Sequence, residues 1–396
     1  MDIGGTSTDC AFVVDGVPEL TGAGKIEDME ISFPLRTIHT LGAGGGTIAK
    51  VKGGRFELGP ESSGAAPGPA CFGFGGEDPT VTDACVVVGY FSTSGVLAGK
   101  VTIDGERAVA AIKHSVADPL RISVDEAASI IRDSIEEKVA SQLREQLERK
   151  GKSPQEYTLA AFGGAGPAFA CGIAERLGVR KVIVPSLCSV FSAFGVSTSN
   201  VVHSYVETVE SISEHRIARV RDLANSMRRR AQIDMKGEGF SQDDVSLSWD
   251  VSLIKASETV FQTCLEDIEE WLRLGERLPD DEADDVKVKV VLRAKGELPQ
   301  VSFSDTLDAP ALVVPRGHRE VVWGGGRKVM TPIYHAEDVL GRPVGIVGPS
   351  DKIEAVDKTE ISGPAVIEAV DTTIVVPYQW KLKTDVHRQF ILSRED

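Results

Sequence analysis

Apolar residues recur at three- and four-residue steps, with charged residues between them, over residues 124–150. This spacing places the apolar side chains on one face of an α-helix and predicts the clearest helix of the chain. Ser123 or Asp125 is expected to cap its start, because a side-chain oxygen there can accept hydrogen bonds from amides of the first turn. The apolar positions are Ala127, Ile130, Ile131, Ile135, Val139 and Leu143.

Short β-branched runs alternate with Gly-rich turns and helical stretches from Met1 to about Tyr205. Residues 181–184 are one such run. A second helix is expected over residues 168–177, which follow an apolar run at 158–162 and a Gly-rich loop. The alternation of strands and helices predicts an α/β fold.

The composition changes after Tyr205. A basic helical segment at 217–235 is followed by strand-like alternation around 245–254 and 286–292. We therefore expect two domains, an α/β domain over residues 1–205 and a smaller, β-rich α+β domain over residues 206–396.

The overall composition is that of an ordinary globular protein. The 396 residues suffice for two or three domains, and 42% hydrophobic with 26% charged residues argues against disorder. A net charge of −16 repels a nucleic-acid backbone, so we expect no nucleic-acid partner. The acidic residues 280–285 are expected to form a solvated loop.

The six cysteines show no Cys-x-x-Cys pair, which favours reduced thiols over a disulfide framework or a zinc site. No apolar run approaches the roughly 20 residues of a membrane helix, and no signal peptide is recognisable. We therefore expect no membrane association and a cytoplasmic location. Because Met1 is followed at once by a turn that normally follows a supporting strand, the sequence also indicates a missing upstream segment.

Residues 2–9, Asp-Ile-Gly-Gly-Thr-Ser-Thr-Asp, combine two carboxylates, two adjacent glycines and three hydroxyls at a tight turn. Glycines let a backbone approach phosphate closely, and hydroxyls and amides can donate to phosphate oxygens. Carboxylates can hold a hydrated Mg²⁺ ion. An ordinary hairpin turn is the alternative interpretation of the same residues.

Two further Gly-rich loops occupy residues 42–47 and 163–167. Because glycine raises the entropic cost of ordering a loop, the loop at 42–47 needs an interaction that holds it in place, which a bound ligand could provide. The second opens a helix, whose N-terminal amides and dipole attract an anion or a nucleotide. Residues 163–167 are explained equally well as a turn that packs the helix closely against the preceding strand. Neither loop matches a Walker A or dinucleotide-binding pattern.

Eight stretches of the sequence carry a family resemblance: 2–9 (DIGGTSTD), 37–47 (TIHTLGAGGGT), 59–71 (GPESSGAAPGPAC), 79–84 (PTVTDA), 161–167 (AFGGAGP), 182–204 (VIVPSLCSVFSAFGVSTSNVVHS), 331–334 (TPIY) and 363–377 (GPAVIEAVDTTIVVP). In this order they resemble the hydantoinase A/oxoprolinase family. The resemblance spans nearly the whole chain and is weakest in the middle.

The resemblance implies an ATPase fold similar to actin, Hsp70 and sugar kinases (ribonuclease H-like), in which nucleotide lies between two related halves, followed by a β-rich C-terminal domain. It implies ATP-dependent hydrolysis of a cyclic amide such as 5-oxoproline, a hydantoin or a lactam, with this chain as the ATP-binding subunit or fragment. Phosphoryl transfer would activate the amide oxygen so that water can open the ring. ATP and Mg²⁺ are the implied cofactors, and a hydantoinase B-like subunit or domain is the implied partner.

The resemblance also implies roles for individual residues. Asp2 and Asp9 are expected to hold Mg²⁺ and, with Thr8, to form the catalytic set. The expected nucleotide-binding residues are Gly4, Gly5, Thr6, Gly44, Gly45, Gly46, Gly163, Gly164 and Gly166, of which the last three would border the adenosine.

The sequence departs from the family pattern at its start. The family usually begins with a separate domain that carries its own Asp-x-Gly-Gly-Thr loop, and this chain has one copy, so we expect the N-terminal domain to be lacking. Two other functions remain open: the ATP-binding subunit of an acetone- or acetophenone-type carboxylase, and a non-catalytic scaffold. The sequence does not distinguish between substrates or between oligomeric states, a homo-oligomer included.

Four other side chains and one loop have two interpretations each. His39 and His203 could be acid–base groups or metal ligands, but a single histidine is more often a packed or surface residue. Thr82 and Asp83 could contact a substrate or cap a helix. The Gly-rich residues 323–327 predict a hairpin turn rather than an anion-binding loop.

Overall fold

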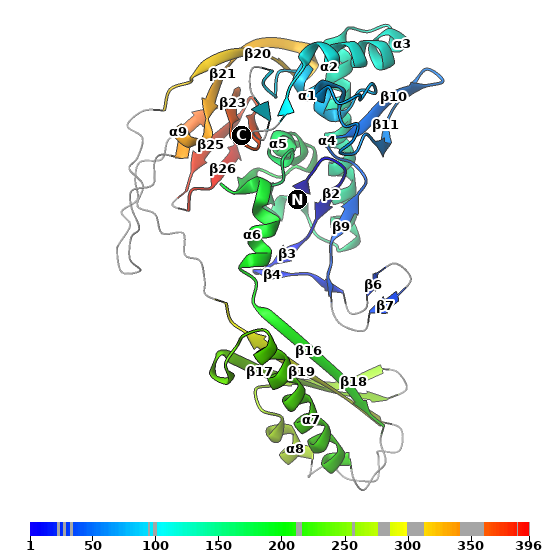
Figure 1. The fold of residues 1–396 in the computed structure, drawn as a ribbon, viewed down its shortest axis with the longest axis vertical. Coiled ribbons are helices and arrows are strands. Elements are labelled where there is room, and N and C mark those ends of the chain that lie inside the picture. The colour runs from blue at the N-terminus through cyan, green and yellow to red at the C-terminus, as the bar shows by residue number, and fades with distance from the viewer. Residues whose placement is uncertain are drawn as a thin grey trace. The chain divides into compact units, whose positions relative to one another are not determined.

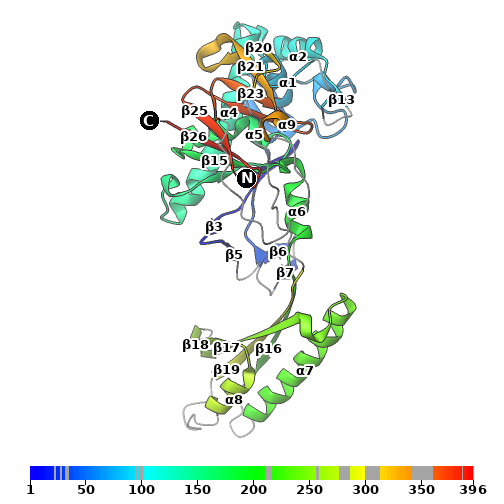
Figure 2. The same ribbon diagram turned by 90° about the vertical axis from the view of Figure 1, so that its left-hand side faces the viewer.

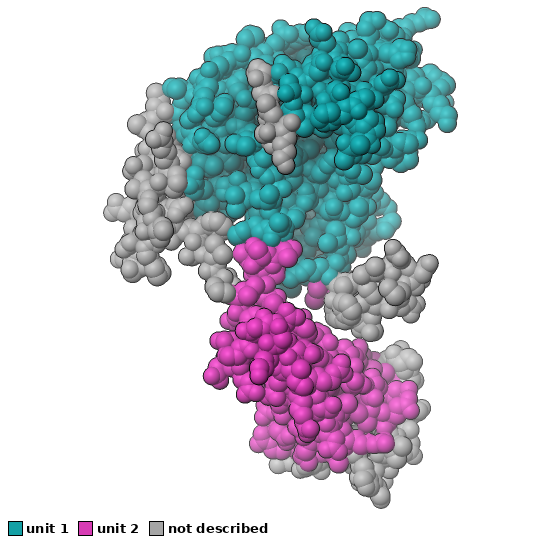
Figure 3. All heavy atoms as spheres, in the orientation of Figure 1, with its two compact units in different colours: residues 1–19, 36–194, 302–396 teal, residues 20–35, 195–301 magenta. Residues whose placement is uncertain are grey.

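The computed structural model describes residues 1–21, 24–26, 29–31, 35–93, 96–97, 101–210, 216–255, 258–275, 286–298, 313–340, 360–385 and 387–395. The chain divides into two compact units, which Figure 3 shows in different colours. Unit 1 contains residues 1–19, 36–194 and 302–396, and unit 2 contains residues 20–35 and 195–301.

The helices of the described residues are α1 (Val81–Val87), α2 (Gly105–Ile112), α3 (Asp118–Leu120), α4 (Val124–Arg149), α5 (Gly166–Leu177), α6 (Phe191–Ser197), α7 (Arg216–Gly237), α8 (Ile268–Gly275) and α9 (Ala336–Leu340). None of the helices within this part of the chain has the length and apolarity needed to cross a membrane. The predicted long helix is confirmed as α4. Ser123 caps it, and Ser123 and Glu126 exchange the reciprocal hydrogen bonds of a capping box.

Three sheets organise unit 1 (Figure 1). A five-stranded sheet has the order β14 (Leu159–Ala160), β15 (Lys181–Val184), β26 (Phe390–Arg394), β25 (Trp380–Thr384), β22 (Glu360–Ser362). A four-stranded sheet has the order β20 (Gly317–Trp323), β21 (Arg327–His335), β23 (Ala365–Glu368), β24 (Thr373–Val376). A small sheet joins β1 (Asp2–Ile3), β2 (Thr8–Cys10) and β9 (His39–Leu41). Mixed sheets with α4 and α5 packed in one core confirm the predicted α/β class.

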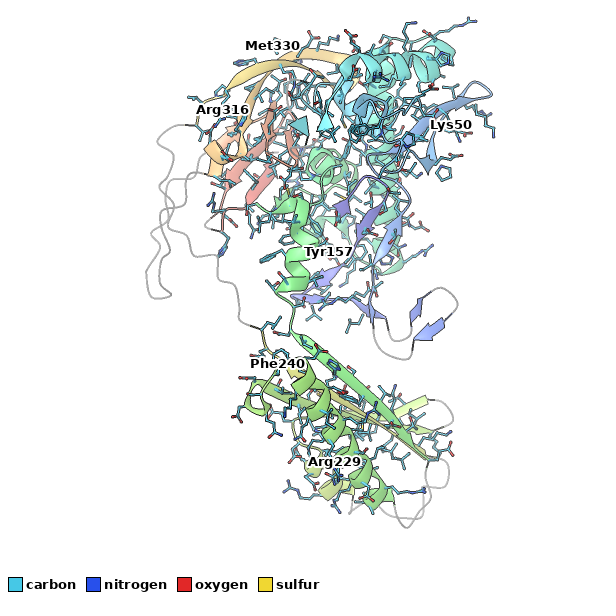
Figure 4. All side chains as sticks on the ribbon, viewed as in Figure 1. Lys50, Tyr157, Arg229, Phe240, Arg316 and Met330 are labelled. Carbon is cyan, nitrogen blue, oxygen red and sulfur yellow. The ribbon has the colours of Figure 1, made fainter. Side chains whose placement is uncertain are left out.

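Shorter strands are divided between the two units, and those within residues 20–35 belong to unit 2. They are β3 (Val13–Val14), β4 (Val17–Pro18), β5 (Leu20–Thr21), β6 (Gly24–Ile26), β7 (Met29–Ile31), β8 (Leu35–Arg36), β10 (Thr47–Lys52), β11 (Arg55–Ser62), β12 (Val96–Leu97) and β13 (Val101–Thr102). The β10–β11 hairpin carries Lys50, labelled in Figure 4, whose ammonium group pairs with Glu61 at 2.8 Å. The Gly-rich residues 324–326 join β20 to β21 in a hairpin, as the sequence predicts.

The two units do not follow the predicted boundary at residue 205. β26 pairs antiparallel with β15, from Lys181 opposite Ser393 to Val184 opposite Phe390. The strands β22, β25 and β26 therefore complete a sheet that begins at β14, and their buried residues share its core. The periodicity of a strand indicates that a strand forms but does not identify its partner, so this long-range pairing could not be read from the sequence.

Unit 2 is an antiparallel sheet covered by helices on one face. The strand order is β16 (Val201–Val209), β19 (Val286–Gly296), β17 (Val245–Lys255), β18 (Glu258–Leu265). α7 and α8 lie on the same face of this sheet (Figure 2). α7 buries Val220, Ala224, Met227, Ala231 and Met235, whose spacing is helical, while Arg229 projects into solvent from its opposite face (Figure 4).

A buried carboxylate connects α4 to α5 in unit 1. Glu136 of α4 is 5% exposed and pairs with Arg176 of α5. Gly172 provides the space, because an added Cβ there would lie 2.3 Å from the Glu136 carboxyl group. Loss of hydration raises the pKa of Glu136 to about 7, against the opposing effects of Arg176 and Arg132.

This pKa shift predicts a pH-dependent stability. Glu136 titrates near 4.5 in an unperturbed chain, so the folded state binds the proton more tightly than the unfolded state. This tighter proton binding stabilises the folded state. The stabilisation is fully present below pH 4.5 and is lost as the pH rises through about 7. We expect urea unfolding between pH 5 and pH 8 to show a steeper decline in the free energy of unfolding for the wild type than for Glu136→Gln, which cannot ionise. Parallel curves for the two proteins would contradict this assignment.

Candidate functional site

The first predicted motif is a hairpin with two different faces. β1 pairs with β2 so that Asp2 is opposite Asp9 and Ile3 is opposite Thr8. Ile3 and Thr8 are fully buried, whereas both aspartates are partly exposed. Since directly opposite residues in an antiparallel pair share a face of the sheet, the two carboxylates lie on the same side of the hairpin.

Thr8 lies on the other side. Its hydroxyl donates a 2.7 Å hydrogen bond to the carbonyl oxygen of Ala43 inside the core. The expectation that Thr8 belongs to the catalytic set is therefore not supported by its position, and we assign it to packing of the hairpin.

The second Gly-rich loop lies behind the hairpin turn. The amides of Gly45 and Gly46 donate to the carbonyl oxygens of Gly4 and Gly5 at 2.9 and 2.5 Å. An added Cβ on Gly44 would lie 2.7 Å from the Gly4 oxygen. These three glycines are buried and the amides of Gly45 and Gly46 are engaged, so their position corresponds to support of the turn rather than to the expected direct contact with nucleotide.

Thr82 and Asp83 have structural roles. The hydroxyl of Thr82 donates to the carbonyl oxygen of Gly45 at 2.9 Å, which anchors the second loop to α1. Asp83 accepts from the backbone and hydroxyl of Thr80, the residue that caps α1, at 2.8 and 2.7 Å. Of the two interpretations drawn from the sequence, the capping one is confirmed for Asp83.

The third loop runs along β1. The amide of Ile3 donates to Phe162 and the amide of Ala165 donates to Ile3, both at 3.1 Å. Gly163 has a φ of +84°, and an added Cβ would lie 2.2 Å from Oδ1 of Asp2. α5 begins here without a side-chain cap, and because Ala165 is bonded to Ile3, the positive end of the helix dipole lies next to the hairpin. Figure 1 shows the N-terminus between α5 and β2.

Hydroxyl groups orient the two carboxylates. Ser192 of α6 donates to Oδ2 of Asp2 at 2.7 Å. Thr40 of β9 donates to Oδ1 of Asp9 at 2.5 Å, and Ser7 donates to its Oδ2 at 3.5 Å. Neither aspartate forms an ion pair with a described residue, so two like charges lie on one face without a protein cation.

Hydrogen-bond donors are available next to these acids. In the described part of the chain, the amides of Gly5, Thr6 and Gly164 have no hydrogen-bond partner, and all three residues are exposed. Across all the residues that the structure describes, there is no cluster of three or more His, Cys, Asp or Glu side chains that could hold a metal ion. A cation bound here would therefore use two carboxylates together with water or ligand oxygens, which is the usual coordination of Mg²⁺ at phosphate sites.

The two histidines lie elsewhere. His39 precedes Thr40 in β9, so its ring points to the opposite side of the strand and packs edge-on against Phe12 at 5.7 Å. His203 belongs to unit 2, where its Nε2 lies 3.2 Å from the Glu238 carboxylate. Neither histidine contacts the aspartates.

A cleft of about 490 Å³ is connected to the third loop through one of its lining residues. The hydroxyl of Thr372, which lines the cleft, donates to the Gly164 carbonyl oxygen at 3.0 Å, and Ser189 donates to the carboxylate of Asp371 next to it. The sequence did not single out these residues or Ser192, because no local spacing places them near residue 164 or residue 2. Lining residues include Phe91, Ser186, His335, Glu337, Glu368 and Thr373.

Comparisons with known proteins agree on one family. The family model described as hydantoinase/oxoprolinase matches residues 1–205. The chain is 29% identical over its full length to the acetophenone carboxylase gamma subunit of Aromatoleum aromaticum, covering 56% of that protein. It is 26% identical over 99% of its length to the caprolactamase subunit alpha of Pseudomonas jessenii, covering 58% of that protein.

Solved structures give the same result. A nucleotide-free structure of acetone carboxylase aligns over the whole chain and 58% of its own chain, with a TM-score of 0.80 and 26% identity. The ATP-dependent caprolactamase of Pseudomonas jessenii aligns over the same fractions, with a TM-score of 0.70 and 26% identity. The chain thus spans between 56 and 58% of the length of these relatives. With half of its residues matched by one family model and relatives along its whole length, this chain belongs to the hydantoinase/oxoprolinase family.

Proposed function

We propose that this chain binds Mg·ATP at the β1–β2 hairpin and supplies the ATP-using part of an enzyme that opens a cyclic amide, such as 5-oxoproline, a hydantoin or a lactam. One observation carries the proposal. Asp2 and Asp9 lie on one face of a hairpin whose turn presents free amides next to the uncapped start of α5.

The residues present fit the chemistry of a nucleotide and its metal. The amides of Gly5 and Thr6, together with the N-terminus of α5, would bind phosphate oxygens. Asp2 and Asp9 would bind Mg²⁺, directly or through water. Bound ATP supplies a phosphoryl group that can activate an amide oxygen for ring opening. The residues of this chain hold the phosphates and keep the carboxylates in place.

The nucleoside end has room in the same unit. The hydroxyl of Thr372 donates to the carbonyl oxygen of Gly164. The cleft that Thr372 lines is large enough for a base and a ribose. In this proposal Gly163, Gly164 and Gly166 border the adenosine, and the fold is of the actin and sugar-kinase type. Gly44, Gly45 and Gly46 act indirectly by holding the turn.

A carboxylase is the second candidate, because the acetone carboxylase structure has the higher TM-score of the two aligned structures. In both cases we propose that a hydantoinase B-like subunit completes the reaction, since the relatives named above include subunits of larger enzymes. A cytoplasmic location and a homo-oligomer stay predictions from the sequence.

Calorimetric titration of Mg·ATP into the purified chain tests the proposal. We expect saturable binding that weakens when Mg²⁺ is removed with EDTA. Phosphate release with the co-expressed partner subunit, measured with 5-oxoproline, caprolactam or hydantoin and separately with a ketone plus bicarbonate, then distinguishes the hydrolase from the carboxylase. An absence of nucleotide binding by the chain and by its complex would instead favour the non-catalytic scaffold.

A further inference from the structure

The carboxylate of Asp2 is held from two sides by residues distant in sequence. Ser192 donates to Oδ2 at 2.7 Å from α6, 190 residues further along the chain. Oδ1 lies so close to Gly163 that an added Cβ there would be 2.2 Å away. Because the two oxygens meet different neighbours, these contacts define one orientation of the carboxylate.

This orientation opposes an electrostatic repulsion. Asp2 and Asp9 are direct cross-strand partners, a geometry in which Cβ atoms lie about 5 Å apart and like charges repel. The hydroxyl of Thr40 holds Asp9 in the corresponding way. Without the hydroxyl of Ser192, the Asp2 carboxylate is free to rotate away from Asp9. The two acids would then no longer present their oxygens to one cation.

We propose that Ser192 is a positioning residue that holds Asp2 in the orientation needed to bind the metal of Mg·ATP. The proposal rests on the Mg·ATP site described above and adds α6 to it. Ser192 acts through Asp2. Its loss should therefore weaken the metal-dependent part of nucleotide binding and leave the phosphate contacts of the hairpin turn unchanged.

The test compares binding of Mg·ATP with binding of ATP in EDTA, by calorimetry on the full chain. Ser192→Ala is expected to weaken Mg·ATP binding about 3- to 10-fold, the range of the net contribution of one typical hydrogen bond, and to change metal-free ATP binding by less than about twofold. Ser192→Thr keeps the hydroxyl and should restore most of the affinity. Ser199→Ala is the matched control, because Ser199 is exposed two residues after α6 and donates to the Gly195 carbonyl oxygen.

A double-mutant cycle tests the route of the effect. In an Asp2→Asn background, removal of the Ser192 hydroxyl should have no further effect on Mg·ATP affinity, because the group through which it acts is already lost. An equal loss in both backgrounds would overturn the positioning role. So would wild-type affinity for Mg·ATP in Ser192→Ala, a result that leaves the proposed function intact. If the wild-type chain binds neither form of ATP, the proposed function itself fails, and the role of Ser192 fails with it.

Discussion

Replacing Asp9 with alanine is expected to lower Mg²⁺-dependent ATP turnover by about 10²- to 10³-fold, the usual cost of losing one group that stabilises charge in a reacting site. Asp9 is one of two carboxylates that share a face of the hairpin, and its oxygens accept hydrogen bonds from Thr40 and Ser7. Turnover is measured as phosphate release by the chain with its partner subunit, and binding by calorimetry with and without Mg²⁺.

The fold should tolerate this change. Asp9 forms no ion pair with a described residue, and its removal also relieves repulsion with Asp2, so we expect the free energy of unfolding to change by less than about 1 kcal/mol. Asp78→Ala is the control, because it also removes one carboxylate from unit 1 but at an exposed position outside the hairpin. Unchanged turnover in Asp9→Ala, or equal losses in both variants, would refute the role of Asp9.

Gly163→Ala is expected to destabilise the protein by about 2–4 kcal/mol and to abolish Mg·ATP binding. An alanine at a φ of +84° is strained, and its Cβ would lie 2.2 Å from Oδ1 of Asp2 and 2.6 Å from the carbonyl oxygen of Ile3. The clash would displace either β1 or the loop that opens α5. Urea unfolding measures the stability, and calorimetry measures the binding.

Gly164→Ala provides the control for stability in the same loop. Gly164 is exposed, and the nearest atom to an added Cβ would be the carbonyl oxygen of Asp371 at 3.9 Å. We expect this variant to unfold within about 1 kcal/mol of the wild type. Equal stability of the two alanine variants would contradict the prediction that close packing of Gly163 against β1 stabilises this loop.

Local spacing in the sequence determined α4 with its Ser123 cap, the strand–loop–helix unit that ends in α5, and the turn between Asp2 and Asp9. Each of these depends on interactions among residues close together in the chain, such as capping bonds and periodic burial, so the pattern of residue types is sufficient to predict them. The resemblance carried by the Gly-rich stretches also identified the family, which the family model confirms.

The tertiary structure alone decided which Gly-rich loops keep amides without a hydrogen-bond partner in the described chain. Three loops had the same composition signal, but the amides of Gly45 and Gly46 are bound by the hairpin turn, whereas those of Gly5 and Gly164 have no partner in the described chain. It also brought Ser192 to Asp2 and paired β26 with β15, against the predicted boundary at residue 205. Contacts across 190 or more residues leave no periodic trace in the sequence, because a side chain or strand edge can satisfy its hydrogen bonds with many partners and only packing selects one.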